Sequence, residues 1–126
     1  KVVLFAVPGA FTPTCSAKHL PGFIEKADQI KAKGVDEIAC IAVNDAFVMG
    51  AWGEAQGAGS AVKMVADGNG DFAQACGLTI DRSGFGLGQR MQRCAMVVDT
   101  GTVTQLFVEE PGQFEASTAE NVLANL

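Results

Sequence analysis

Tyrosine, closely spaced cysteine pairs and long apolar runs are all missing from this sequence. The 126 residues include no tyrosine and a single histidine. The longest apolar stretches, residues 2–8 and 38–43, fall far short of the roughly 20 residues that a membrane-spanning helix needs. The charged start of a signal peptide is also missing. We therefore expect no membrane-spanning segment and no membrane partner.

Positive charge is scarce and scattered along the chain. Nine lysines and arginines stand against fourteen aspartates and glutamates, which gives a formal net charge of −5. The basic residues form no cluster, whereas binding to a phosphate backbone needs a basic face. We therefore expect no nucleic-acid partner.

The four cysteines form no Cys-x-x-Cys pair. Cys15, Cys40, Cys76 and Cys94 follow one another at intervals of 25, 36 and 18 positions. These intervals match no zinc-binding pattern, and His19 is the only histidine that could complete one. Two disulfides are possible, but a chain with 48% hydrophobic residues does not require them to fold. We expect reduced thiols in the cytoplasm and no bound metal.

Length and strand patterning predict one α/β domain over residues 1–126. A chain of this length is typical of a single domain. Apolar runs rich in strand-forming residues predict buried strands at residues 2–7, 37–43 and 62–66. Residues 94–98 and 102–108 predict an antiparallel hairpin that turns at residues 99–101. Residues 82–89 are expected to be irregular.

Helices are expected between and after these strands. An apolar stripe from Leu20 to Ile30 predicts the first helix, with Pro21 separating a short initial turn from the main body. Asp45 and its neighbour Asn44 predict the cap of a second helix. A short helix is expected at residues 71–76, and Ser117 with Glu120 predicts a capping box for the last one. This order predicts a three-layer sandwich with a mixed central sheet, as in thioredoxin-like folds.

Residues 7–16 carry the strongest chemical signal. This segment leaves the carboxyl end of a predicted strand and enters a helix, which is where ligand sites of open α/β sheets lie. Cys15 would occupy the first helical turn, where free backbone N–H groups favour the nucleophilic thiolate. Two prolines stiffen the loop, and the Thr12 hydroxyl can turn toward the sulfur. The alternative is a buried, unreactive cysteine that only packs.

These residues resemble those of a known family. Pro8-x-x-x-Thr12-x-x-Cys15 is similar to the active-site motif of the peroxiredoxins. Residues 7–16 followed by His19-Leu-Pro21 resemble the type II, or peroxiredoxin V, group in particular. The resemblance covers nearly the whole chain, including residues 42–48, 65–68, 86–99 and 114–117. It implies a thioredoxin-like fold, and this sequence departs from the family in that we expect it to lack the N-terminal extension that relatives carry.

The resemblance implies a thiol-dependent peroxidase. Cys15 would attack one oxygen of hydrogen peroxide or an alkyl hydroperoxide and become a sulfenic acid. Thr12, Arg93 and loop N–H groups would stabilise the moving charge, while Pro8 would shield the sulfenic acid from water. Neither a metal nor an organic cofactor is required. The competing hypothesis is a non-catalytic thioredoxin-like module that senses redox state or binds a partner, which has no need of Thr12, Cys15 and Arg93 together.

The arginine and the pocket residues are assigned by the same resemblance. Arg90 is a close rival of Arg93, but Arg93 directly precedes the strand predicted at residues 94–98, where the family's arginine stands.

The resemblance also suggests a homodimer. The residues expected to line the substrate pocket are Gly9, Phe11, Thr14, Phe47 and Phe85.

The remaining cysteines predict how the enzyme is reset. Some relatives carry a resolving cysteine in the segment matched by residues 114–118, and none stands there in this chain. Cys40 and Cys94 fall on predicted buried strands, and Cys76 is expected to be the most exposed of the three. We therefore expect a one-cysteine cycle reset by glutathione with glutaredoxin, or by thioredoxin.

His19, one turn past Cys15, is expected to be a local hydrogen-bonding residue or part of the crevice wall.

Overall fold

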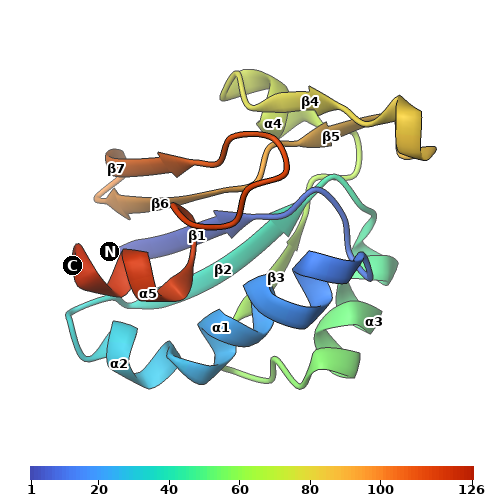
Figure 1. The fold of residues 1–126 in the computed structure, drawn as a ribbon. Coiled ribbons are helices and arrows are strands. Elements are labelled where there is room, and N and C mark those ends of the chain that lie inside the picture. Colours follow the sequence, from blue (N-terminus) through green and yellow to red (C-terminus); the bar gives the residue numbers. More distant parts are fainter.

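A five-stranded mixed sheet runs through the centre of the computed structural model, which describes residues 1–126 (Figure 1). The strand order is β3-β2-β1-β6-β7. The central strand is β1 (Val2–Ala6), which pairs in parallel with β2 (Glu37–Ala42), and β2 pairs in parallel with β3 (Lys63–Ala66). On its other side β1 pairs antiparallel with β6 (Cys94–Asp99), which continues into β7 (Thr102–Val108). The predicted mixed α/β sheet is confirmed.

Two layers cover the two faces of this sheet (Figure 1). One face packs against four helices and shares with them a core of 20 buried residues. The opposite face carries a smaller core of 7 buried residues under a short helix and a two-stranded sheet. No helix of the chain is both long and apolar enough to cross a lipid bilayer. The first layer consists of α1 (Leu20–Glu25), α2 (Ala27–Lys31), α3 (Ala46–Gln56) and α5 (Ala119–Ala124), and the second of α4 (Asp71–Ala75), β4 (Thr79–Asp81) and β5 (Gln89–Met91).

The β6–β7 hairpin turns as the sequence predicts. Thr100 and Gly101 lie between the paired residues Asp99 and Thr102, and both have positive φ, 50° and 81°. A two-residue turn of this hand matches the natural twist of antiparallel strands. The turn thereby brings β7 back along β6 and sends the chain toward the end of the sheet where β6 begins.

The segment expected to be irregular, residues 82–89, connects two short strands. A 3₁₀ turn (Ser83–Phe85) connects β4 to β5, and the last predicted loop residue, Gln89, already belongs to β5. The Arg82 N–H donates to the Gly88 carbonyl oxygen at 2.7 Å, which closes the base of this loop. The prediction of irregular backbone therefore holds for residues 82–88, whereas the flanking strands β4 and β5 were missed, because strands of three residues are too short to show a periodic pattern.

The last helix begins one residue later than the predicted capping box requires. Thr118 is the N-cap, and its Oγ1 accepts a hydrogen bond from the Asn121 N–H at 3.1 Å. Ser117 is buried, and its hydroxyl instead donates to Glu109 Oε2 at 2.7 Å. The prediction for Ser117 was therefore wrong: a cap oxygen accepts from a backbone N–H, and Thr118 takes that role, while Ser117 is held by the Glu109 carboxylate. Glu120 then falls in the first turn without closing a capping box.

Candidate active site

Two side-chain hydrogen bonds hold the loop that precedes Cys15, residues 8–14. The Ala10 N–H donates to Asn44 Oδ1 at 2.9 Å, which fastens the loop to the end of β2. The Thr12 hydroxyl donates to the Gly9 carbonyl oxygen at 2.6 Å. Phe11 adopts a left-handed conformation with φ 63°, which costs energy in a residue with a Cβ atom. Such a strained loop persists only where surrounding contacts hold it.

Cys15 lies in the first helical turn after this loop, as predicted. The Ser16 N–H donates to the Thr12 carbonyl oxygen at 2.9 Å, so helical bonding starts at Thr12. The turn then widens to a π-helix (Cys15–His19), in which the Cys15 carbonyl oxygen accepts from the Leu20 N–H. π-helical turns often occur at functional sites. Here the wide turn leaves both Cys15 and His19 fully buried.

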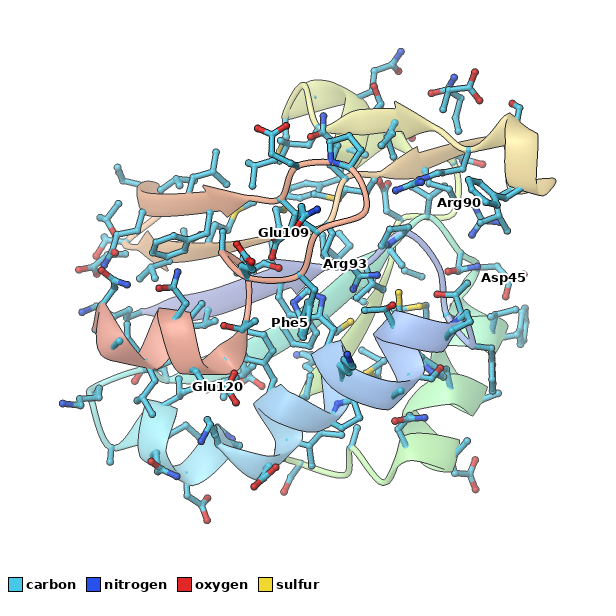
Figure 2. All side chains as sticks on the ribbon, viewed as in Figure 1. Phe5, Asp45, Arg90, Arg93, Glu109 and Glu120 are labelled. Carbon is cyan, nitrogen blue, oxygen red and sulfur yellow. The ribbon has the colours of Figure 1, made fainter.

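Arg93 contacts the Cys15 sulfur directly. Its Nη2 donates to Cys15 Sγ at 3.1 Å, and this hydrogen bond joins residues 78 positions apart. Figure 2 shows Arg93 between the loop that carries Glu109 and the helix that follows the residue 8–14 loop. A guanidinium at this distance stabilises a thiolate by charge and by hydrogen bonding.

Arg90, the rival candidate, supports the loop instead of the sulfur. Its Nε donates to the Leu87 carbonyl oxygen at 2.8 Å, and its Nη1 to the carbonyl oxygens of Val43 at 3.2 Å and Pro8 at 3.4 Å. A Cβ atom on Gly9 would come within 3.2 Å of the same Nη1. Arg90 therefore joins three backbone segments around the residue 8–14 loop.

A buried histidine holds Arg93 in place. Arg93 Nη1 donates to His19 Nδ1 at 2.9 Å, because a guanidinium can only donate. The other ring nitrogen, Nε2, therefore carries the hydrogen and donates to the Ser117 carbonyl oxygen at 2.9 Å. Burial, and then the charge of Arg93, lower the pKa of His19 to about 3. The ring stays neutral at physiological pH, in agreement with its predicted local hydrogen-bonding role.

Glu109 fixes the far end of this chain of contacts. Its carboxylate accepts hydrogen bonds from the backbone N–H groups of Glu115, Ala116 and Ser117 at 2.8, 3.2 and 2.8 Å, in addition to the Ser117 hydroxyl. Burial opposes ionisation of Glu109, but these hydrogen bonds outweigh it and lower its pKa overall. The resulting network runs from Glu109 through Ser117, His19 and Arg93 to Cys15. Sequence reasoning missed Glu109. Its backbone N–H donates to the Arg93 carbonyl oxygen at 3.0 Å, one position beyond the Cys94–Val108 pair, so extending the predicted hairpin by one pair would have placed it opposite Arg93.

A pocket of about 380 Å³, called the peroxide pocket below, reaches Thr14 and Arg93, which adjoin Cys15, while the buried Cys15 does not itself line it. Of the residues expected at a substrate pocket, Thr14 and Phe85 are part of its lining, whereas Gly9, Phe11 and Phe47 are not. Phe11 and Phe47 are 56% and 89% exposed, since neither side chain finds a place in the core. The full lining consists of Pro8, Thr12, Pro13, Thr14, Arg82, Phe85, Leu87 and Arg93.

Comparison with known proteins identifies the family. The Redoxin family model matches residues 1–123. Peroxiredoxin-2B of Arabidopsis thaliana is 53% identical over 126 residues, which are 100% of this chain and 78% of that protein. This chain belongs to the peroxiredoxin family. The enzyme is therefore a thiol-dependent peroxidase with a thioredoxin-like fold, as the sequence predicts.

Two further relatives bear on this peroxiredoxin. Peroxiredoxin-2E-2, chloroplastic, of Oryza sativa subsp. japonica is 57% identical over 129 residues, and the match covers 100% of this chain and 57% of that protein. A crystal structure of reduced Prx3 in complex with H₂O₂ from Vibrio vulnificus is 63% identical, with a TM-score of 0.97. That match covers 100% of this chain and 81% of the other.

Cys15 is the only cysteine of this peroxiredoxin whose sulfur accepts a hydrogen bond from a cationic side chain. Cys40 is buried, and burial, followed by the nearby Cys15, raises its pKa well above the usual value. Burial also raises the pKa of Cys94 to about 12. Cys76 is exposed at the end of α4, and all four cysteines are free thiols. No group of three or more His, Cys, Asp or Glu side chains is arranged to hold a metal ion.

The buried neutral His19 predicts a pH-dependent stability. In the unfolded chain its pKa is about 6.5, so the unfolded state takes up a proton below that pH while the folded state does not until about pH 3. The free energy of unfolding should therefore fall as the pH decreases from 6.5 toward 3, by about 2 kcal/mol between pH 7.5 and pH 5 from this group alone. Urea unfolding at these two pH values measures the difference.

A His19→Gln variant is the matched comparison. Its unfolding free energy should be lower than that of the native protein at pH 7.5 but should lose about 2 kcal/mol less on going to pH 5. The Glu109 carboxylate titrates at lower pH and is common to both proteins. Parallel pH dependences for the two proteins would contradict the assignment of a neutral, buried His19.

Proposed function

We propose that this peroxiredoxin reduces hydrogen peroxide and alkyl hydroperoxides through a sulfenic acid on Cys15. The observation that carries the proposal is the 3.1 Å hydrogen bond from Arg93 to the Cys15 sulfur beside the peroxide pocket. The 63% identical Prx3 of Vibrio vulnificus, described in complex with H₂O₂, supports a peroxide substrate. Thr12 and Pro8 line the same pocket, which supports their proposed roles.

The proposed reaction moves negative charge from sulfur to oxygen. The Cys15 thiolate attacks the nearer peroxide oxygen, an S–O bond forms, and the O–O bond breaks. The departing oxygen takes a proton and leaves as water or an alcohol. Arg93 can donate to the sulfur at the start and to the oxygens as their charge grows. Thr12 already donates its hydroxyl hydrogen to Gly9, so its oxygen is free to accept the O–H of a peroxide and orient it.

An external thiol is the proposed reductant. Cys40 and Cys94 are buried, and burial keeps both in the poorly nucleophilic thiol form. Cys76 lies on α4, which covers the opposite face of the sheet from Cys15. We therefore propose a one-cysteine cycle in which glutathione with glutaredoxin, or thioredoxin, returns Cys15 to its thiol.

Trapping the oxidised state tests both the nucleophile and the cycle. After one equivalent of hydrogen peroxide without a reductant, dimedone should label one site per chain, and mass spectrometry should place the label on Cys15. The matched control is Cys76→Ser, which removes the exposed thiol and should give the same labelling. A rapid, quantitative bridge between Cys15 and Cys40 would contradict the one-cysteine cycle. A chain that consumes no peroxide would favour the non-catalytic module.

We also propose that this peroxiredoxin forms a homodimer. Three exposed phenylalanines support this: Phe11 on the residue 8–14 loop, Phe47 at the start of α3, and Phe85 on the rim of the peroxide pocket, with Phe85 75% exposed. Exposed large apolar side chains that lie near a functional site often mark an interface. Sedimentation equilibrium at micromolar concentration should give twice the chain mass, and a single-chain mass would contradict the proposal.

Two further proposals concern the domain organisation, which rests on the packing of the cores, and the cellular location, which rests on the free thiols. Both hydrophobic cores share the central sheet, which supports a single domain over residues 1–126 that unfolds in one cooperative transition. Four free thiols support a reducing location, for which we propose the cytoplasm. The chloroplastic rice relative makes a plastid the alternative outcome of a fractionation experiment.

A further inference from the structure

A second cavity, of about 310 Å³, adjoins the peroxide pocket and has a polar wall. Thr14, Arg82 and Arg93 line both cavities, so the two meet beside the arginine that contacts Cys15. This polar cavity, as it is called below, reaches from Lys18 on the helix after Cys15 to the loop at Glu110. A molecule held there would lie against Arg93, whose Nη2 contacts the Cys15 sulfur.

Arg82 is an unpartnered cation between the two cavities. Its Nε is buried and has no hydrogen-bond acceptor in the folded protein. It forms no ion pair, since the single salt bridge of the chain joins the N-terminal ammonium to Asp36. Its guanidinium carbon lies 5.8 Å from the centre of the Phe85 ring, on the wall of the peroxide pocket. A buried donor without an acceptor is costly, and a bound anion would supply the missing acceptor.

The side chains around the polar cavity favour an anionic ligand that also carries a cationic group and peptide bonds. Lys18, Arg82 and Arg93 line it, and Lys18 and Arg82 form no ion pair. Of the two acids on the wall, Glu109 is already occupied by the backbone of residues 115–117. Glu110 remains available for a cationic group. The side-chain amides of Gln92 and Gln113 add donors and acceptors of the kind that recognise peptide bonds.

We propose that the polar cavity binds the carboxylate of a small, peptide-like thiol that reduces the Cys15 sulfenic acid. This proposal rests on the one-cysteine cycle proposed above. Arg82 and Lys18 would hold the carboxylate, while Glu110 would accept an ammonium group. An overall net charge of −5 repels anions elsewhere on the surface, so these local cations would provide the selectivity.

The reductive step balances without any further reactant. The sulfur of the thiol attacks Cys15 Sγ, an S–S bond forms, and the S–O bond of the sulfenic acid breaks. The released hydroxide takes the proton of the thiol and leaves as water. A second thiol then attacks the outer sulfur of the mixed disulfide, which releases Cys15 as a thiol and the small molecule as its disulfide.

The experiment compares two thiols that differ in charge. Cys15 is oxidised with one equivalent of hydrogen peroxide, and its reduction by glutathione or by glutathione diethyl ester is followed in stopped flow. The diethyl ester masks both carboxylates but keeps the thiol. The native protein should react about tenfold faster with glutathione than with the ester, the scale of one charge-assisted contact. This preference should fall toward unity in Arg82→Gln.

Two further variants test whether the preference depends on cations of the polar cavity or on any surface cation. Lys18→Gln should also reduce the preference, and it does so at an exposed position where folding is not at risk. Lys33→Gln removes the same charge from an exposed residue near the start of β2, at the opposite end of the sheet, and should leave the preference unchanged.

Other outcomes have distinct meanings. Equal rates for the two thiols in the native protein, or an undiminished preference in both Arg82→Gln and Lys18→Gln, would overturn the proposal. The first half-reaction is also measured with a carboxylate-bearing hydroperoxide and its methyl ester. A charge preference there that Arg82→Gln abolishes would assign the polar cavity to the peroxide instead. Failure to consume peroxide in the absence of any thiol would contradict the proposed function itself.

Discussion

A Cys15→Ser variant is expected to lose all measurable peroxide reduction while it keeps its fold. A serine hydroxyl stays protonated at neutral pH and is a far weaker nucleophile toward an O–O bond than a thiolate. No neighbouring base can activate it, because His19 Nδ1 is already occupied by Arg93. Arg93 can still donate to a serine oxygen, so the buried side chain keeps a partner. Stopped-flow peroxide consumption and circular dichroism measure the two properties.

Cys76→Ser serves as the control for this result. It makes the same chemical change at an exposed thiol on α4 and should retain the activity of the native protein. If Cys15→Ser were folded and still turned over peroxide within about tenfold of the native rate, another group would be the nucleophile. If Cys76→Ser were the inactive variant, both the site and the proposed cycle would be wrong.

Sequence reasoning placed Cys15 from local chain geometry, whereas Arg93, 78 positions away, came from the family resemblance. A strand that ends at Ala6, two residues before Pro8, and a helix that starts near Thr12 place Cys15 in a helical first turn. The hairpin at Thr100 and Gly101 follows in the same way from residues that suit positive φ. Such features are encoded within a few residues, so a single sequence is sufficient to predict them.

The features that escaped prediction depend on contacts between distant residues. The Glu109 carboxylate is linked to Cys15 through Ser117, His19 and Arg93, and the His19–Ser117 bond spans 98 positions. That network also holds Ser117 through its backbone N–H and its hydroxyl, both of which donate to Glu109, and the cap falls to Thr118 instead. Similarly, the exposure of Phe47 follows from the orientation of α3, which residue type alone does not determine. Hydrophobicity predicts burial only on average.

An Arg93→Lys variant is expected to reduce peroxide about 10²-fold more slowly than the native protein, the scale of losing one preorganised donor. Arg93 makes two contacts at once, from Nη2 to Cys15 Sγ at 3.1 Å and from Nη1 to His19 Nδ1 at 2.9 Å. A lysine has a single nitrogen, which cannot reproduce this planar fork. Because the positive charge remains, the loss would report geometry more than charge. The second-order rate constant with hydrogen peroxide is the measurement.

Arg90→Lys distinguishes a contact with the sulfur from support of the loop. Arg90 reaches three backbone carbonyl oxygens and not Cys15, and a lysine can keep one of those bonds. Its rate constant should therefore fall much less than that of Arg93→Lys. Alkylation of Cys15 by iodoacetamide at pH 6 should slow in Arg93→Lys and change little in Arg90→Lys, since only Arg93 stabilises the thiolate by direct contact. The reverse ranking would mean that the loop that Arg90 supports, and not the guanidinium beside the sulfur, sets the reactivity of Cys15.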